Sequence, residues 1–306
     1  MGPYAIKTLG LAIKAGKHQV IKNLDLTIAR EECLVFLGTN KSGKTTLLKA
    51  LSGKILPDQG SLIIQGREYK SISSNLLPGI ELVPQENPMN REKTLAELFN
   101  TKTDSLKLSD HQKKELVNNS LDFFNLHHDT TTSLKKLSPE KQNKASIALA
   151  LLSRPEILLI DQPTQGLSAE AKKKLWPLLN KLKGKLTLIL ATSDWEEAFI
   201  LADRIALLSQ GKLLALGTPA EIKRDLFSIE TFEVKSDFIP ENVLKAMVDR
   251  FPRVIETTEG VEIMGDELKI EEIEEFFQEH GVKVKEINIK QPSLEALFQR
   301  LRLKER

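Results

Sequence analysis

Short apolar runs along the chain alternate with longer segments in which apolar residues recur at helical spacing. The apolar runs cover residues 34–37, 157–160, 186–190 and 205–208. Uninterrupted runs of this length are typical of parallel strands that are buried on both faces of a sheet. Helical periodicity covers residues 46–51, 170–182 and 196–202. The alternation predicts an open α/β sheet with helices packed on both faces.

Two further regions have a different pattern. Residues 86 to about 134 are polar, lack strand character and carry scattered apolar positions at helical spacing, which predicts a helical insertion at about 86–152. After Leu226, alternating strands are predicted at 231–235, 261–263 and 282–289, and helices at 243–251, 270–280 and 293–301. These elements predict a small C-terminal α+β module of ferredoxin-like character. The chain therefore divides into residues 1–228 and 229–306.

Composition excludes several classes of protein. The 306 residues carry 44 Lys and Arg against 42 Asp and Glu, so no overall charge favours nucleic acid as a partner. Cys33 is the single cysteine; it lies beside an apolar run and is predicted to be a buried structural thiol. No apolar stretch approaches the roughly 20 residues that a membrane-spanning helix needs, and no signal peptide opens the chain. Any work at a membrane is therefore expected to require another chain.

The most specific motif is a phosphate-binding loop at residues 38–45. Its sequence, Gly-Thr-Asn-Lys-Ser-Gly-Lys-Thr, fits G-x-x-x-x-G-K-[ST] between a predicted strand and a predicted helix. Glycines let the backbone amides wrap around phosphate oxygens at the positive end of the helix. Lys44 is predicted to reach the β- and γ-phosphates, and the Thr45 hydroxyl to ligate Mg²⁺. The predicted nucleotide contacts are Gly38, Thr39, Asn40, Lys41, Ser42, Gly43, Lys44, Thr45 and Thr46.

An acidic residue ends the second predicted core strand. Asp161 follows the buried run 157–160. In a chain that already has a phosphate loop, a carboxylate at this point can hold the Mg²⁺ shell opposite Thr45. Asp161 is therefore a predicted metal ligand.

The order of these motifs resembles the ATP-binding subunit of an ABC transporter. The resemblance covers about residues 5–225 and rests on the phosphate loop together with the segments 82–85, 137–141, 161–168, 191–198, 203–212 and 217–222. A weaker similarity links residues 291–298 to the C-terminal module of ABC-2-type exporter ATPases. The resemblance implies the α/β fold of a P-loop NTPase with a helical subdomain, and ATP with Mg²⁺ as cofactors. It also implies that Gln85 contacts the metal and the nucleotide, although an ordinary polar residue at a strand end is the alternative.

Four positions depart from the family pattern. Gln162 replaces the Glu that follows the metal-binding Asp and polarises the attacking water, and an amide cannot accept a proton from water. Ser193 replaces the His that contacts the γ-phosphate. Ser168 replaces an Asp that makes contacts across the dimer, and Ala15 stands near the position where the family has an aromatic residue that stacks on adenine. An engineered, ATP-trapping substitution is an alternative origin for Gln162, but it does not explain the other three positions.

The signature segment, which in the family reads Leu-Ser-Gly-Gly-Gln, is also altered. Ser138 is retained, and the resemblance implies that it contacts the nucleotide of the opposite subunit. Pro139 has no N–H to donate, and Glu140 brings a negative charge toward a triphosphate. The alternative is that Glu140 points to solvent with Lys141 shielding it.

The sequence therefore predicts an exporter-type ATP-binding subunit that binds MgATP in a head-to-tail dimer but hydrolyses it poorly, with Gln162 and Ser193 as the degenerate catalytic positions. The resemblance implies two kinds of partner, a second and more complete ATPase subunit and membrane-spanning permease subunits. It places the chain peripherally at the cytoplasmic face of the membrane. An active homodimeric transport ATPase and a soluble regulatory ATP-binding protein are the alternative functions.

Overall fold

The computed structural model describes residues 4–16, 18–69, 77–86, 90–227, 229–266 and 268–290. The chain forms two compact units, Met1–Pro219 and Ala220–Arg306. The boundary falls at the start of helix α7 (Pro219–Phe227), before the predicted boundary after residue 228.

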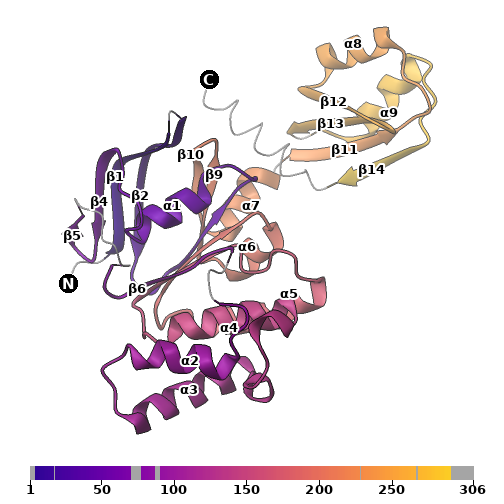
Figure 1. Cartoon of the computed structure of the whole chain (residues 1–306). Coiled ribbons are helices and arrows are strands. Elements are labelled where there is room, and N and C mark those ends of the chain that lie inside the picture. The colour runs from indigo at the N-terminus through magenta and orange to yellow at the C-terminus, as the bar shows by residue number, and fades with distance from the viewer. Residues whose placement is uncertain are drawn as a thin grey trace. The chain divides into compact units, whose positions relative to one another are not determined.

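A six-stranded sheet with the order β10-β9-β3-β8-β7-β6 forms the centre of the first unit (Figure 1). Neighbouring strands run parallel except for the antiparallel pair β9 and β10. The strands are β3 (Cys33–Leu37), β6 (Ile80–Val83), β7 (Ile157–Asp161), β8 (Thr187–Thr192), β9 (Arg204–Ser209) and β10 (Lys212–Gly217). Every residue of β3, β7 and β8 is buried, as expected for parallel strands covered on both faces. The predicted α/β fold is confirmed.

Cys33 begins β3 and is fully buried. Burial raises the pKa of its thiol to about 12, so the group stays protonated and unreactive, as predicted for a structural cysteine.

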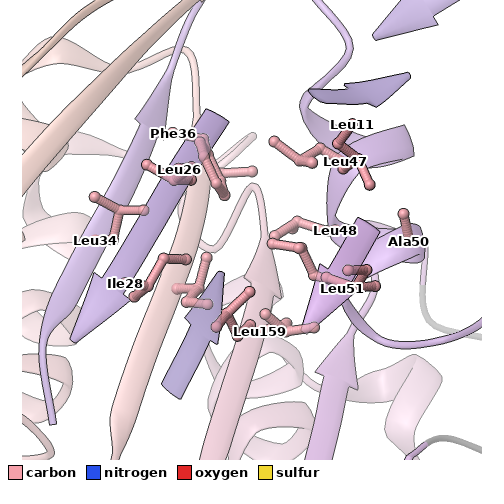
Figure 2. Packing of buried hydrophobic residues seen from close by; sticks show 14 of the residues in the cluster. Leu11, Leu26, Ile28, Leu34, Phe36, Leu47, Leu48, Ala50, Leu51 and Leu159 are labelled. Carbon is pink, nitrogen blue, oxygen red and sulfur yellow. The ribbon is translucent and has the colours of Figure 1, made fainter. Parts of the chain in front are cut away.

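A second, antiparallel sheet packs over helix α1 (Lys44–Leu51) and is not among the predicted elements. Its order is β2-β1-β4-β5, with β1 (Tyr4–Ala15), β2 (His18–Ala29), β4 (Gln59–Ile64) and β5 (Arg67–Glu68). Leu47, Leu48 and Leu51 of α1 share one hydrophobic cluster with residues of both sheets, including Leu11 and Leu159 (Figure 2). The β1–β2 ladder contains several register shifts, which break the strict alternation by which a half-buried strand is recognised in sequence.

Helices fill most of the chain between β6 and β7. They are α2 (Leu95–Asp104), α3 (Asp110–Phe124) and α4 (Pro139–Leu151), with two short 3₁₀ turns between α3 and α4. Helices α2 and α3 begin with capping boxes at Thr94 and Ser109, each with the hydroxyl bonded to the amide three residues later. These helices lie within residues 86–152. After β7 the chain continues through α5 (Ala169–Asn180) and α6 (Trp195–Leu201).

The second unit is a β-α-β-β-α-β arrangement, the element order of a ferredoxin-like unit. Its elements after α7 are β11 (Ile229–Lys235), α8 (Glu241–Arg250), β12 (Arg253–Thr257), β13 (Gly260–Asp266), α9 (Ile270–Glu279) and β14 (Glu286–Lys290). The strands pair antiparallel in the order β12-β13-β11-β14. Phe232, Met247 and Phe277 are among the buried residues of its core.

The second unit differs from the predicted module in two of its strands. Strand β12 was not predicted, because Val254 and Ile255 are adjacent and do not alternate. The predicted strand 282–289 was wrong at its start, since β14 begins at Glu286; Val282 and Val284 pack against the core from a connecting segment. The predicted helix 293–301 lies outside the described residues.

The connectivity of the parallel strands places several predicted site residues at one edge of the central sheet. The phosphate loop follows β3, Gln85 lies just beyond β6, Asp161 ends β7 and Ser193 follows β8. Parallel strands present their carboxyl ends at the same edge, where ligands bind in open α/β sheets.

Candidate functional site

The loop at residues 38–45 curls tightly between β3 and α1. Lys41 and Gly43 have positive φ angles of 64° and 105°. A Cβ at Gly38 would lie 2.4 Å from the backbone oxygen of Leu208 and 2.6 Å from the Ser42 Oγ, so only glycine fits there. Gly43 immediately precedes α1, so the backbone amides of the loop and the positive end of the helix meet at one point. The loop thus has the geometry of an anion site.

Lys44, the first residue of α1, is held inside the loop. Its Nζ donates hydrogen bonds to the carbonyl oxygens of Gly38 (2.7 Å) and Thr39 (2.9 Å) and to the Ser42 Oγ (3.3 Å). Only 4% of the residue is exposed. Burial lowers the pKa of the ammonium to about 8, and the nearby Asp161 carboxylate opposes this shift.

The lowered pKa of Lys44 predicts a proton linkage. A bound triphosphate raises the pKa again, because it stabilises the charged ammonium. We therefore expect net proton uptake on MgATP binding at pH 8.5, and an affinity that falls as pH rises through about 8.

The pH dependence of folding stability has the opposite sign to that of MgATP affinity. The unfolded chain holds this proton up to its ordinary pKa of 10.5, so the contribution of Lys44 to stability increases as pH rises from about 8.

Titration calorimetry in two buffers of different ionisation enthalpy measures the proton uptake directly. The exposed Lys49 of α1 supplies the control, since Lys49→Ala removes a lysine near the loop without touching the buried ammonium. Equal heats in both buffers at pH 8.5 would contradict the linkage.

Asp161 lies beside the loop at the end of β7 and is 4% exposed. Burial raises the pKa of its carboxyl group, against a hydrogen bond from Thr45 and the charges of Lys44 and Lys49. Its Oδ1 is buried and has no hydrogen-bond partner among the described residues. A carboxylate oxygen left unsatisfied beside a threonine hydroxyl suits a hard divalent cation, which takes oxygen ligands. The residues therefore fit Mg²⁺.

A pocket of about 440 Å³ opens over the loop. It is lined by Val20, Asn40, Lys41, Ser42, Gly43, Lys44, Thr45, Thr46, Gln85, Gln162 and Gln165. Most of the loop, together with Gln85 and Gln162, is thus brought together as predicted. Val20 and Gln165 were not predicted. Gln165 could have been predicted from its position in the loop after β7, because that loop lies at the same sheet edge as the phosphate loop.

Ala15, expected to lie near the position of the family's adenine-stacking aromatic residue, is not among the residues that line the pocket. Ala15 is exposed at the end of β1, paired with His18 across the turn to β2. The strand residue that lines the pocket is the aliphatic Val20. Val20 of β2, and not Ala15 of β1, therefore lies over the loop.

Gln162 and Ser193 differ in their relation to the pocket. Gln162 lines it, with a left-handed backbone (φ 54°) fixed by a 2.8 Å hydrogen bond from its N–H to the Ala191 oxygen. Ser193 is half-buried after β8 and is not among the residues that line the pocket. The structure thus brings the Gln162 side chain to the phosphate loop but not that of Ser193.

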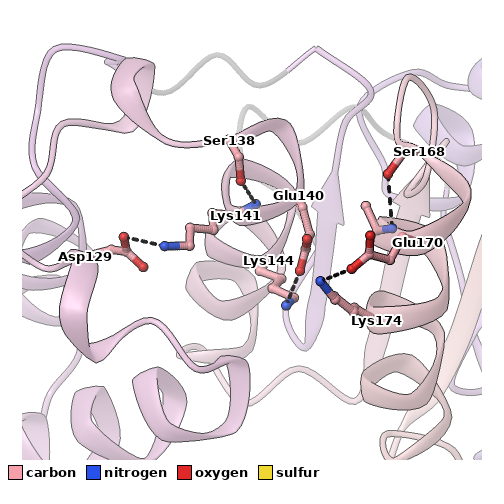
Figure 3. Close-up of polar contacts among 9 residues, drawn as sticks. Asp129, Ser138, Glu140, Lys141, Lys144, Ser168, Glu170 and Lys174 are labelled. Atoms are coloured by element: carbon pink, nitrogen blue, oxygen red, sulfur yellow. Dashed lines mark hydrogen bonds and ion pairs between the residues drawn. The ribbon is translucent and has the colours of Figure 1, made fainter.

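Ser138 lies at the start of α4, away from the pocket. Its Oγ caps the helix by accepting a hydrogen bond from the Lys141 N–H (3.4 Å) (Figure 3). Glu140 pairs with Lys144 at 2.6 Å, whereas Lys141 pairs with Asp129 at 2.7 Å. The expectation that Lys141 shields Glu140 was therefore wrong, because residues four apart on a helix face each other.

Ser168 has a similar capping role at α5. Its Oγ accepts a hydrogen bond from the Ala171 N–H at 3.3 Å (Figure 3). Serine is a favourable residue at this position, so the hydroxyl stabilises the helix.

Comparison with known proteins decides the family. The model of the family described as ABC transporter matches residues 21–165. The chain is 30% identical over 236 residues to the Nod factor export ATP-binding protein I of Rhizobium sp. (strain N33), covering 76% of this chain and 77% of that protein. The chain belongs to the ABC transporter ATP-binding family.

Other ABC proteins give the same assignment with different coverage. Human retinal-specific phospholipid-transporting ATPase ABCA4 is 31% identical over 221 residues, which are 71% of this chain. The chain spans only 10% of the length of that relative. The spermidine/putrescine import ATP-binding protein PotA of Clostridium acetobutylicum is 32% identical, covering 71% of this chain and 62% of that protein.

Solved ABC structures share the fold. The cbiO1 subunit of Clostridium perfringens, part of the ABC transporter complex cbiONQ, superposes with a TM-score of 0.67 at 22% identity, over 82% of this chain and 97% of that one. A dimeric ATP-binding cassette bound to ADP and Pi has a TM-score of 0.63 at 24% identity, over 70% of this chain and 98% of that one. As an ABC ATP-binding domain, the chain binds nucleotide.

No helix in the described ranges combines the length and the apolar composition that crossing a bilayer requires.

Proposed function

We propose that this ABC subunit holds MgATP and hydrolyses it poorly, as the non-hydrolysing member of a transport complex. One observation carries the proposal. Among the described residues that line the pocket, none is Asp, Glu or His, and the position after Asp161 presents the Gln162 amide. An amide can hold a water molecule but cannot take its proton, so the pocket lacks a general base.

The phosphate loop and Lys44 would supply the binding energy. Backbone amides of the loop face the phosphates, and the Lys44 ammonium would exchange its bonds to the Gly38 and Thr39 carbonyls for phosphate oxygens. Thr45, Asp161 and Gln85 would hold Mg²⁺. The cation neutralises phosphate charge when bound. None of these groups removes a proton from water.

In a head-to-tail dimer, the altered signature segment of this chain would complete the second nucleotide site, so the chemistry there would depend on the partner's own residues. In a head-to-tail dimer, Ser138 would face the nucleotide of the partner. Ser138 is already used as a helix cap, Pro139 has no N–H, and Glu140 is neutralised by Lys144. The Glu140–Lys144 pair lowers the repulsion that the carboxylate would exert on a phosphate. We therefore propose a heterodimer whose partner retains the Glu and His that this chain lacks.

A second pocket, of about 380 Å³, offers a docking place for a membrane subunit. Leu82, Leu98 and Leu149, from β6, α2 and α4, give it an apolar lining. Lys102 and Glu81 also line it and form a 2.7 Å ion pair. An apolar lining with a charged pair suits a short helix of a permease. We propose that such docking holds the chain peripherally at the cytoplasmic face of the membrane.

The direction of transport is proposed to be export. This chain covers 77% of the Nod factor export protein but 62% of the polyamine import protein, at similar identity. Residues 291–298, which lie outside the described residues, resemble in sequence the C-terminal module of ABC-2-type exporter ATPases. This resemblance also favours export.

The pocket composition predicts weak selection among bases. Val20 is aliphatic, and no aromatic residue is among the described residues that line the pocket. Stacking on an aromatic platform contributes about 1–3 kcal/mol per base, so its loss removes most of the preference for adenine. We expect MgATP and MgGTP to bind within about threefold of each other, a difference of at most about 0.7 kcal/mol, since 1.4 kcal/mol corresponds to about tenfold. Titration calorimetry with both nucleotides checks this, and a preference for ATP above about thirtyfold would contradict it.

Recovery of the complex from native membranes tests the proposed function. Affinity-tagged full-length chain, expressed at its native level, is purified in mild detergent and every bound chain is identified. A second ABC ATPase with Glu and His at the positions of Gln162 and Ser193, together with a permease, is the expected result. Two copies of this chain with a permease and no other ATPase would indicate an active homodimer. Recovery without any membrane chain would indicate a regulatory ATP-binding protein. Either outcome overturns the proposal.

A further inference from the structure

Two side-chain hydrogen bonds connect the loop that follows β7, residues 162–168, to the segments on either side of helices α2 and α3. The Gln85 Nε2 donates to the Gln165 Oε1 at 2.5 Å, and the Asn143 Nδ2 donates to the Pro163 oxygen at 2.7 Å. Gln85 comes from the segment after β6, and Asn143 from α4. Both bonds connect the loop to segments at the two ends of the helical region. Only the first joins two residues that line the nucleotide pocket.

The bond between the two glutamines has a defined polarity. A glutamine amide carries one acceptor oxygen and one NH₂ donor group. Because Gln85 uses its NH₂ group toward Gln165, its carbonyl oxygen is directed away from that bond. A divalent cation binds only the oxygen of an amide. The Gln165 oxygen therefore selects the rotamer of Gln85 in which the ligating atom is available.

We propose that Gln165 is a positioning residue that orients the Gln85 amide toward Mg²⁺. This inference rests on the proposed function, in which Gln85 contacts the metal of MgATP. Outer partners that orient a metal ligand act through the ligand and not through the metal, and their loss typically costs about 10- to 100-fold in metal affinity. Gln165 therefore acts only when both the metal and the Gln85 side chain are present.

The effect is measured as the ratio of ATP affinity in excess Mg²⁺ to ATP affinity in excess EDTA. Titration calorimetry of the full chain gives both values. We expect Gln165→Ala to lower this ratio about tenfold while the affinity in EDTA stays unchanged. Gln165→Glu retains an acceptor oxygen at the same reach and is expected to keep the ratio at or above that of the wild type. Gln165→Lys can only donate and is expected to behave like Gln165→Ala.

Two controls separate orientation from loop stability. Asn143→Ala removes the bond to the Pro163 oxygen of the same loop without touching Gln85, and it is expected to leave the ratio unchanged. In a Gln85→Ala background, Gln165→Ala should have no further effect, since the two substitutions remove one interaction. Thermal melting of each variant, at the exposed Gln85 and Gln165 and at the half-buried Asn143, measures whether the chain stays folded.

The possible results distinguish this inference from the proposed function. Failure of the wild-type chain to bind MgATP would overturn the proposed function itself. A second possible result is that the wild type binds MgATP normally, but Gln165→Ala lowers the ATP affinity equally in Mg²⁺ and in EDTA. That result overturns only the role of Gln165. The same holds if Gln165→Ala acts fully in the Gln85→Ala background, or if Gln165→Glu fails to retain the ratio.

Discussion

Replacing Lys44 with alanine is expected to lower the affinity for MgATP at least about a hundredfold. The Lys44 ammonium is buried within the phosphate loop and bonded to its carbonyls, so it is already positioned at the anion site. Hydrogen bonds to charged groups contribute roughly 1.5–3 kcal/mol each, and two phosphate contacts together correspond to a hundredfold or more. Calorimetric titration of the pure chain, or competition with a fluorescent nucleotide, measures the loss.

The Lys44→Ala variant can lose affinity either because a phosphate contact is removed or because the chain is less stably folded. Alanine at position 44 leaves the Gly38 and Thr39 oxygens without their donor, which costs stability. Lys44→Gln restores a donor without the charge and should show the same loss of affinity with a smaller loss of thermal stability. Lys49→Ala, on the exposed side of α1, should change the affinity less than about threefold. Unchanged affinity in Lys44→Gln would show that the loop is not the phosphate site.

The second large effect concerns hydrolysis, which is expected to sit near background and to stay there when Gln162 alone is replaced by glutamate. Losing general-base and electrostatic assistance typically costs a factor of about 10² to 10⁴ each. The Gln162→Glu change restores a carboxylate at the pocket, but Ser193 still supplies no imidazole and is not among the residues that line it. We expect the single variant to gain less than about tenfold in steady-state phosphate release.

A matched pair of variants makes the result decisive. Gln162→Glu combined with Ser193→His should exceed either single change, because groups that act together in one catalytic step are not additive. Gln162→Asn, which shortens the side chain and keeps the amide, should remain at background. Brisk turnover from Gln162→Glu alone would mean that this glutamine is the only defect, and the proposed assignment of the chain as a degenerate subunit would fail.

Local sequence determined the parts of the site that consist of contiguous residues. The fixed spacing of residues 38–45 specifies a turn that only glycines allow, and the structure has that turn with Lys44 inside it. The buried run before Asp161 predicts a strand that delivers this carboxylate to the same sheet edge. Each prediction depends on a few neighbouring residues, and so the sequence alone was sufficient.

The C-terminal module and the second sheet show where local pattern stops being informative. Strand β12 has no alternation of its own, and it becomes a strand because β13 pairs with it. Strands β1 and β2 contain bulges, so their faces are defined by the core over α1 and not by a period of two. Pairing between strands is a long-range choice, made by burial of the whole face.

Only the tertiary structure decided which side chains meet. Val20 lies over the loop where Ala15 was expected, because the pairing of β1 with β2 sets which strand residue faces the pocket. Gln85 meets Gln165 across the ends of adjacent parallel strands, 80 positions apart along the chain. The physical reason is common to both. A motif fixes the backbone of its own few residues, whereas contacts between distant segments depend on the strand order and on the packing of the complete core.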